Sequence, residues 1–381
     1  MFYLGRSGKW TCDEAYLETL DGHRLFSYAE NPLHVVSYSL PYEGIISREE
    51  LLEHLHVHPR LHDAVPFVFK YYQRDWGLCC TQRQRGLLAD DQYRVVIRSR
   101  FEPGTLKVGE VVIQGDSREC IVFCAHLCHP AMANDDLTGV VVGLDVMRTL
   151  LHRPGLRYTY RFLIVPETVG SAAFLSHHEE LLALMRGGMF LDVLGTTHPH
   201  GLQHSLAGNS AMDLCAALVM REMDPGSWTG AFLTGILNDE RMFNAHGVGV
   251  PMVSLSRVLP KGHSDWPYRE YHSSADNPDG VHWRNLTASR DLVQGVIRAL
   301  ERNAVPVPLY KGELFCSRYP SIDYRRMRDL IHSVPYFMDG RRTVAEIAHA
   351  VGHGFFAVAD FIDVLVGEGL VRLDWPQEPS V

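Results

Sequence analysis

The sequence predicts an α/β protein with a mostly parallel sheet, helices on both faces of that sheet, and two smaller modules. Short apolar runs alternate with helical patterns from residue 105 to residue 304, which is typical of parallel strands joined by crossover helices. Residues 36–104 are instead rich in aromatic and β-branched residues, and they predict a small, mostly β insertion. Residues 305–381 follow a proline-containing linker and predict a helical module, whereas residues 1–35 are assigned to the large domain.

Each predicted strand of the large domain is short and apolar, and a helical pattern follows it. The strands are expected at residues 119–126, 158–167, 189–193 and 251–256. The helices are expected at residues 138–152, 171–185, 212–223 and 286–303. Within the insertion only residues 48–55 show a helical pattern. This alternation brings the carboxyl ends of several strands to one edge of a sheet, where ligands of such folds gather.

The last segment has the pattern of a winged helix. Thr343 is placed to cap a first helix, and Glu346 completes a capping box. Apolar residues then recur at helical spacing over residues 355–367, and a short apolar strand follows at 369–373. The second helix carries acids and neither Lys nor Arg. Because phosphate contacts need cations, we expect this module to pack against protein, and DNA binding is disfavoured.

Composition narrows the class of protein. The chain has 381 residues, 46% of them hydrophobic and 21% charged, which is ordinary for a soluble globular protein with a full core. Its formal net charge of −9 argues against a nucleic-acid or anionic-membrane surface spread over the whole protein. No apolar run approaches the length of a membrane span, and the N-terminus lacks the continuous apolar region of a secretory signal. We therefore expect a cytoplasmic protein whose eight cysteines are free thiols, and homo-oligomerisation stays open.

Polar side chains gather at the predicted strand ends: His126 with Asp135, then Glu167, then Asp192, and finally the loop that carries His272. Taken singly, a histidine or an aspartate at such a place is more often a structural residue or a helix cap. Together, His126, Asp135 and His272 supply nitrogen and oxygen donors that suit Zn²⁺ with an open position for water. Glu167 is then placed to act as general base on that water.

Other polar residues near these strand ends have two interpretations each. Asp192 is either a fourth metal ligand or a hydrogen-bonding partner of a loop. His129 lies in the stretch HLCH, but a proline follows it and turns the chain away, so it is assigned to the substrate side, with metal ligation left open. Asp239 and Glu240 either bind the ammonium group of a substrate or begin a solvated helix. Tyr271 is also assigned to the substrate side.

The order His126, Asp135, Glu167, Asp192 and His272 resembles that of the zinc aminopeptidases with a co-catalytic metal site, whose fold the glutaminyl cyclases share. The stretches CAHLCHPAMANDDLTG, VPETVGS, NDERMF and EYHSSADNPDGV are more closely similar to a bacterial subfamily of aminopeptidase-like proteins. That subfamily has a small β-rich inserted domain and a C-terminal winged helix. The resemblance implies a zinc exopeptidase-like fold and a zinc-dependent amide hydrolase, above all an aminopeptidase that acts on a peptide or a small amide.

The resemblance also bears on the number of metal ions. Two-zinc relatives carry a pair of glutamates where this chain has Glu167 and Thr168. The missing second carboxylate favours one zinc ion per chain. Two alternatives to an aminopeptidase stay open. The same metal site supports deacylation or glutaminyl cyclisation of a small biosynthetic intermediate, and a regulatory or scaffold protein could keep the fold without catalysis.

Overall fold

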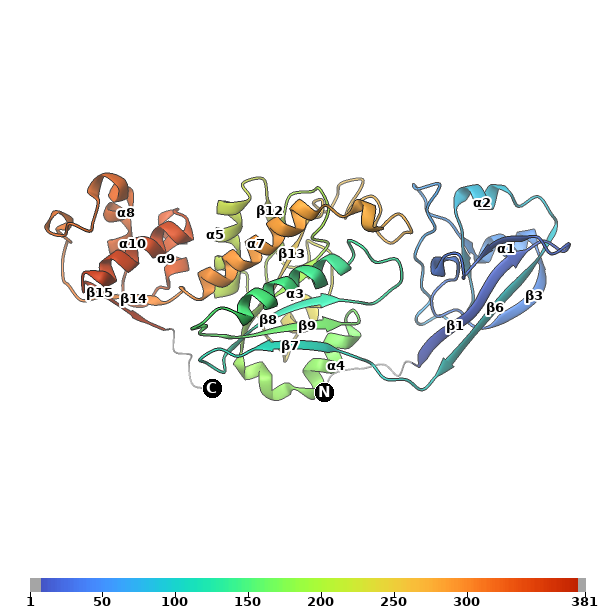
Figure 1. Cartoon of the computed structure of the whole chain (residues 1–381), viewed down its shortest axis with the longest axis horizontal. Helices are drawn as coiled ribbons and strands as arrows, with labels where there is room; N and C mark the ends of the chain where they lie inside the picture. Colours follow the sequence, from blue (N-terminus) through green and yellow to red (C-terminus); the bar gives the residue numbers. More distant parts are fainter. Residues whose placement is uncertain (1–7, 376–381) are drawn as a thin grey trace.

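The computed structural model describes residues 8–375. Three regions follow one another along the longest axis of the molecule (Figure 1): a small β domain (residues 9–102), a large α/β domain (residues 109–300) and a C-terminal module (residues 305–374). The large domain lies between the other two, so both smaller regions are in a position to contact it.

The large domain is built on a sheet of seven strands in the order β12-β11-β13-β10-β8-β9-β7. The strands are β7 (Gly109–Ile113), β8 (Cys120–His126), β9 (Thr159–Val165), β10 (Met185–Asp192), β11 (Gly201–Gln203), β12 (Trp228–Gly230) and β13 (Met252–Ser256). The four central strands β13, β10, β8 and β9 are parallel to one another, whereas β7 pairs antiparallel with β9 and β11 antiparallel with β13. The predicted mostly parallel sheet is therefore confirmed.

Helices cover both faces of this sheet, as predicted. They are α3 (Leu137–Leu151), α4 (Val169–His177), α5 (Ala211–Met223), α6 (Glu240–Asn244) and α7 (Trp283–Leu300). Successive side chains of β8 point to opposite faces, so Phe123 packs in the core under α3, α5 and α7, while Cys124 packs in the core under α4 and α6. Two hydrophobic cores thus hold the strand ends in place. Short 3₁₀ turns occur at η1 (Pro32–His34), η2 (Glu179–Leu184), η3 (Pro278–Gly280) and η4 (Cys316–Arg318).

The small β domain has an antiparallel sheet of four strands in the order β2-β1-β6-β3. Its elements are β1 (Lys9–Glu18), β2 (Arg24–Ser27), β3 (Tyr42–Ser47), α1 (Arg48–His54), β4 (Leu55–His56), β5 (Leu78–Cys79), α2 (Gln82–Gly86) and β6 (Gln92–Glu102). The strands β1 and β2 differ from the sequence interpretation, which grouped residues 1–35 with the large domain. The reason is the long pairing of β1 with β6, which buries Leu17 in the same core as Val95.

The C-terminal module contains three helices and a two-stranded antiparallel sheet. Its elements are β14 (Val305–Pro308), α8 (Tyr324–Phe337), α9 (Val344–Val351), α10 (Phe355–Gly367) and β15 (Val371–Asp374). The predicted capping box is present, because Glu346 N donates to Thr343 Oγ1 at 3.3 Å and Thr343 N donates to Glu346 Oε2 at 2.7 Å. The assignment of the module to the winged-helix class stays a prediction.

This module packs on the large domain through α5, α7, α9 and α10. Arg302, just after α7, reaches Asp360 and Asp363 of α10 at 2.7 and 2.6 Å. At the start of α10, Phe355 N donates to the carboxylate of Glu222 in α5. No single helix within residues 8–375 is long and apolar enough to cross a membrane; α9 and α10 reach that length only together, and they are bent by 118°.

Candidate metal centre

The site lies where β8 ends and α3 begins. Asp136 caps α3 by accepting a hydrogen bond from Gly139 N at 2.9 Å, and it also accepts from Val193 N, just after β10, at 3.2 Å. A Cβ atom at position 139 would lie 2.3 Å from the carbonyl oxygen of Leu191, so only glycine lets the helix approach β10 this closely. This tight junction fixes the loop that carries Asp135.

Asp135 lies at the centre of the site, with histidines on two sides. Its Oδ1 is 3.2 Å from His126 Nε2, and its Oδ2 is 3.2 Å from His272 Nε2 and 3.8 Å from His129 Nε2. The loop around it is held by Asp276, which accepts hydrogen bonds from three consecutive backbone amides, those of residues 133, 134 and 135. Asp276, 141 residues further along the chain, thus fixes the backbone that carries the Asp135 carboxylate.

Three groups of side chains in the described chain have donor atoms within 4.8 Å of one another. They are His129 with Asp135 and His272, His126 with Asp136 and Asp192, and His126 with Cys128 and Glu167. All five residues predicted for the metal and the base therefore belong to one neighbourhood. The predicted ligands His126 and His272 nevertheless fall into different groups, on opposite sides of Asp135.

Asp192 closes the buried side of the site at the end of β10. Its Oδ2 accepts a hydrogen bond from Asn238 Nδ2 at 2.7 Å, and its Oδ1 lies 3.9 Å from His126 Nε2. Asp192 Oδ1 and Asp135 Oδ2 are buried and accept no hydrogen bond from residues 8–375, although Asp135 Oδ2 lies at ion-pair distance from His272 Nε2. A buried carboxylate oxygen without a partner is costly, and a bound cation would remove that cost.

The pKa shifts of the buried side chains also favour a bound cation. Burial raises the pKa of Asp136 well above its usual range, and burial with the nearby charges of Asp136 and Asp135 does the same for Asp192. Burial alone would lower the pKa of His126, but its contacts with Asp135 and Cys128 outweigh that effect and raise it. Three buried carboxyl groups and three imidazoles form an acid-rich set of oxygen and nitrogen donors, which fits Zn²⁺.

The two sides of Asp135 differ in their access to solvent. The side chain of His272 is 32% exposed, whereas those of His126 and Asp192 are 2% and 1% exposed. His129 is largely buried, and burial lowers its pKa to about 4, so its ring is neutral at pH 7 and keeps a free nitrogen lone pair. Of the two sides of Asp135, the one with His129 and His272 is therefore the one with a partly exposed imidazole.

Glu167 follows β9 and faces the mouth of the site. Its Oε2 lies 3.8 Å from Cys128 Sγ, which is itself 3.2 Å from His126 Nδ1 and 3.0 Å from His129 Nδ1. The next residue, Thr168, has a φ of 55°, and its backbone N donates to Asp239 Oδ1 at 2.8 Å. Asp239 therefore holds the turn that presents Glu167.

The two carboxylates predicted to bind a substrate ammonium are both fully buried. Asp239 also accepts a hydrogen bond from Ser171 Oγ, and burial raises its pKa to about 6. Glu240 accepts from Gln203 Nε2 and from Asn238 N, each at 3.0 Å, within the interior. The structure brings Asp239 next to the Glu167 turn and leaves Glu240 in an internal network, so their role toward substrate stays a prediction.

Aromatic rings frame the exposed side of the site. Tyr271, predicted on the substrate side, stacks on His272 with ring centroids 3.9 Å apart. Phe67 of the small β domain stacks on His129 with centroids 4.4 Å apart. Sequence reasoning did not find Phe67, because the surrounding stretch AVPFVFKYY has several aromatic residues and no pattern that shows which one faces the large domain.

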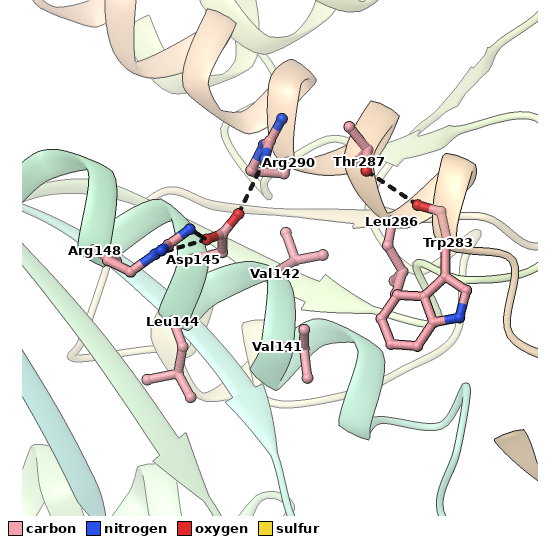
Figure 2. A pocket seen from close by; sticks show the side chains of 9 residues that line it. All are labelled: Val141, Val142, Leu144, Asp145, Arg148, Trp283, Leu286, Thr287 and Arg290. Atoms are coloured by element: carbon pink, nitrogen blue, oxygen red, sulfur yellow. Dashed lines mark hydrogen bonds and ion pairs between the residues drawn. The ribbon is translucent and has the colours of Figure 1, made fainter.

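A separate groove of about 410 Å³ lies between α3 and α7 (Figure 2). Its walls are mainly apolar and include the exposed side chains of Val141, Leu144 and Trp283. Asp145 forms ion pairs there with Arg148 and Arg290 (Figure 2). None of the nine residues that line it belongs to the three donor groups. This groove is therefore distinct from the candidate metal centre.

Comparisons with known proteins identify the family. A family model described as a domain of unknown function, DUF4910, matches residues 10–303. A Clostridium acetobutylicum protein, provisionally named a polysaccharide biosynthesis protein with an aminopeptidase-like domain, is 30% identical over 373 residues, which are 96% of this chain and 84% of that protein.

Solved structures give the same result for the fold. A crystal structure of a C. acetobutylicum protein provisionally named a peptidase matches with a TM-score of 0.84 at 30% identity, covering 96% of this chain and 84% of that chain. A zinc aminopeptidase from Bacillus subtilis matches with a TM-score of 0.56 at 15% identity, covering 76% and 83%. The predicted fold class and the resemblance to aminopeptidase-like proteins are confirmed, and the chain belongs to the DUF4910 family.

Proposed function

We propose that this protein is a zinc-dependent aminopeptidase. The observation that carries the proposal is Asp135, a buried carboxylate whose Oδ2 lies 3.2 Å from His272 Nε2 and 3.8 Å from His129 Nε2 at the end of a parallel sheet. The names of the C. acetobutylicum relatives, which include peptidase and aminopeptidase-like, support a hydrolase of the peptidase type.

The zinc ion would be held by His129, Asp135 and His272. This set differs from the predicted one in that His129 takes the place of His126, because the donor atoms of His129, Asp135 and His272 lie within 4.8 Å of one another and the side chain of His272 is 32% exposed. Zinc at such a site supplies Lewis-acid polarisation of a substrate carbonyl and activation of water. His126 and Asp192 would form a second, buried position across Asp135 that fills only when zinc is in excess. One ion per chain therefore remains the expected content.

Glu167 would serve as the general base. It lies in the same neighbourhood as the donor groups, on a turn that Asp239 holds. It would take a proton from the attacking water and return it to the leaving amine, which is the use of one carboxylate as base and then as acid. The proposed location is the cytoplasm, as the sequence predicts.

The test combines metal content with turnover. Elemental analysis of protein purified without chelator should give one equivalent of zinc, and aminoacyl amides should be hydrolysed only by the zinc form. Two equivalents would show that the His126 side is also filled with tightly bound metal. If no zinc binds even after soaking, the hydrolase proposal is wrong.

A second candidate is deacylation of a small biosynthetic intermediate. The name of the C. acetobutylicum relative, which includes polysaccharide biosynthesis, favours this class of substrate. Both reactions break an amide bond with the same metal and base, so only the substrate separates them. A panel that contains aminoacyl amides and N-acylated amino sugars would assign the activity to one class. A zinc-loaded protein inactive on both classes would favour the regulatory or scaffold role.

A further inference from the structure

A short extended segment of the small β domain, residues 65–70, runs beside the loop that carries His272. On one side it is tied to its own domain, because Ser37 N donates to Val68 O and Lys70 N donates to Ser37 O, each at 2.9 Å. On the other side Phe67 N donates to His272 O at 2.8 Å. The pairing continues beyond the histidine, since Ser274 N donates to Val65 O at 2.8 Å. Backbone hydrogen bonds thus join the two domains at a proposed metal ligand.

The ring of Phe67 contacts the two histidines on the Oδ2 side of Asp135. It stacks on His129 with centroids 4.4 Å apart and planes 19° apart. It also meets His272 edge to face, with centroids 5.3 Å and planes 86° apart. The two imidazoles lie 5.1 Å from each other at 77°, so one phenyl ring touches both members of a nearly perpendicular pair. Ala131, in the loop between β8 and α3, packs in the same apolar cluster as Phe67.

We propose that the small β domain completes the metal centre, with Phe67 as a positioning residue that sets the orientation of His129 and His272. The proposal rests on the proposed function, because it assumes that these histidines bind zinc. Groups that orient metal ligands change metal affinity without touching the ion. Phe67 orients the ligands by packing and not through a hydrogen bond. Its aromatic contacts restrict the rotation of the His129 and His272 rings before the ion binds.

Tyr271 is a second aromatic residue that contacts the ring of His272. It stacks on His272 with centroids 3.9 Å and planes 14° apart, while Phe67 approaches the same imidazole with its edge. His272 itself has a φ of 53°, a backbone conformation that most residues with side chains avoid. The hydrogen bond from Phe67 N to His272 O helps to hold that conformation. The small β domain therefore acts on both the backbone and the ring of the ligand.

The experiment compares Phe67→Ala with Phe69→Ala in the full chain. Phe69 is the matched control, because it is 56% exposed and has a described ring contact with Phe67 but with neither histidine. The dissociation constant for zinc, measured by competition with a chromogenic chelator, should rise about 10- to 100-fold for Phe67→Ala. It should stay within about twofold for Phe69→Ala. The visible spectrum of the cobalt-substituted protein should change for the first variant only.

Conservative variants separate positioning from general stability. Phe67→Tyr keeps the ring and should bind zinc like wild type, whereas Phe67→Leu keeps apolar volume and should be weakened. If Phe67→Ala does not show a cooperative thermal transition, the Tyr and Leu pair carries the test. Wild-type affinity in Phe67→Leu or Phe67→Ala would overturn the positioning role while leaving the zinc enzyme intact. A wild-type chain that binds no zinc would instead overturn the proposed function itself.

Discussion

At the scale of single residues, the site depends on one carboxylate that faces two groups of side chains. Asp135 presents Oδ1 to His126 and Oδ2 to His129 and His272. The sequence places these residues at strand ends, and the parallel sheet brings them together, as predicted. The sequence could not show which histidine faces which oxygen of Asp135, because that depends on side-chain rotamers and on the ring of Phe67 from the small β domain.

Glu167→Gln tests the proposed base. The amide keeps the shape of the side chain but cannot accept the proton, so turnover of the substrate should fall by about 10²- to 10⁴-fold. Zinc content should stay at the wild-type value, since Glu167 is not among the proposed ligands. Glu179→Gln, at an exposed position in η2, is the matched control and should leave turnover unchanged. Wild-type turnover in Glu167→Gln would remove this residue from the mechanism.

Substitutions at Asp239 test whether this buried carboxylate holds the Glu167 turn or binds the ammonium group of a substrate. Its Oδ1 accepts hydrogen bonds from Thr168 N and Ser171 Oγ, and an amide oxygen can accept both. We therefore expect Asp239→Asn to keep kcat and KM within about twofold, and Asp239→Ala to lower kcat by about tenfold as the Glu167 turn loosens. Steady-state kinetics with a saturable amide substrate measure both constants. A rise in KM alone for Asp239→Asn would instead support the ammonium-binding role predicted from the sequence.

At the scale of elements, strong local patterns gave accurate predictions and short elements did not. The helix predicted at residues 355–367 has those bounds, and the capping box of Thr343 and Glu346 is present. The three-residue strands β11 and β12 have too few residues for a period to appear, and they were not predicted. Residues 9–18, which form β1, were assigned to the large domain, because their partner strand β6 lies about 80 residues away in the sequence.

At the same scale, Gly139→Ala tests whether the close approach of α3 to β10 positions the metal centre. A methyl group in Gly139→Ala would lie 2.3 Å from the carbonyl oxygen of Leu191, which is backbone and cannot move freely. The free energy of unfolding should fall by about 3 kcal/mol, at the upper end of the cost of overpacking. Zinc affinity should fall with it, since the cap at Asp136 fixes the Asp135 loop.

Gly367→Ala is the matched control for this substitution. Among residues 8–375, no atom outside the neighbouring residues and the helix backbone lies within 4 Å of the added methyl group, and the position is the last residue of α10. Alanine should stabilise the protein slightly, by about 0.5 kcal/mol, because it restricts the unfolded chain. Urea denaturation of the two variants beside wild type measures both values. Equal stability of Gly139→Ala and wild type would show that the junction tolerates movement.

At the scale of the whole molecule, the large domain is contacted from both ends. The small β domain meets it at the His272 loop, and the C-terminal module meets it at α5 and α7. One hydrophobic core includes Val296 of α7 together with Ile347 of α9 and Phe361 of α10. Composition and periodicity predicted three modules, but they contain no information about which surfaces meet. Such contacts join residues that are far apart in the sequence and depend on shape.

The C-terminal module gives the last prediction, which concerns DNA. The acids of α10 are exposed, and Asp360 and Asp363 both pair with Arg302, just after α7. A helix turned toward its own protein and carrying acids is poorly suited to enter a major groove, where phosphate contacts need cations. We therefore expect the full chain to show no submicromolar binding to mixed duplexes at physiological salt, measured by fluorescence anisotropy.

Any weak association at low salt should come from α8 and not from α10. Three exposed arginines lie close together on α8: Arg325, Arg326 and Arg328. A triple Arg→Ala variant of these positions should lose the low-salt signal, whereas Arg302→Ala should keep it. Raising the salt from about 50 to 200 mM should abolish the signal for the wild-type chain, because counterion release supplies its free energy. Tight, sequence-dependent binding that survives this salt would favour the regulatory role over the enzyme.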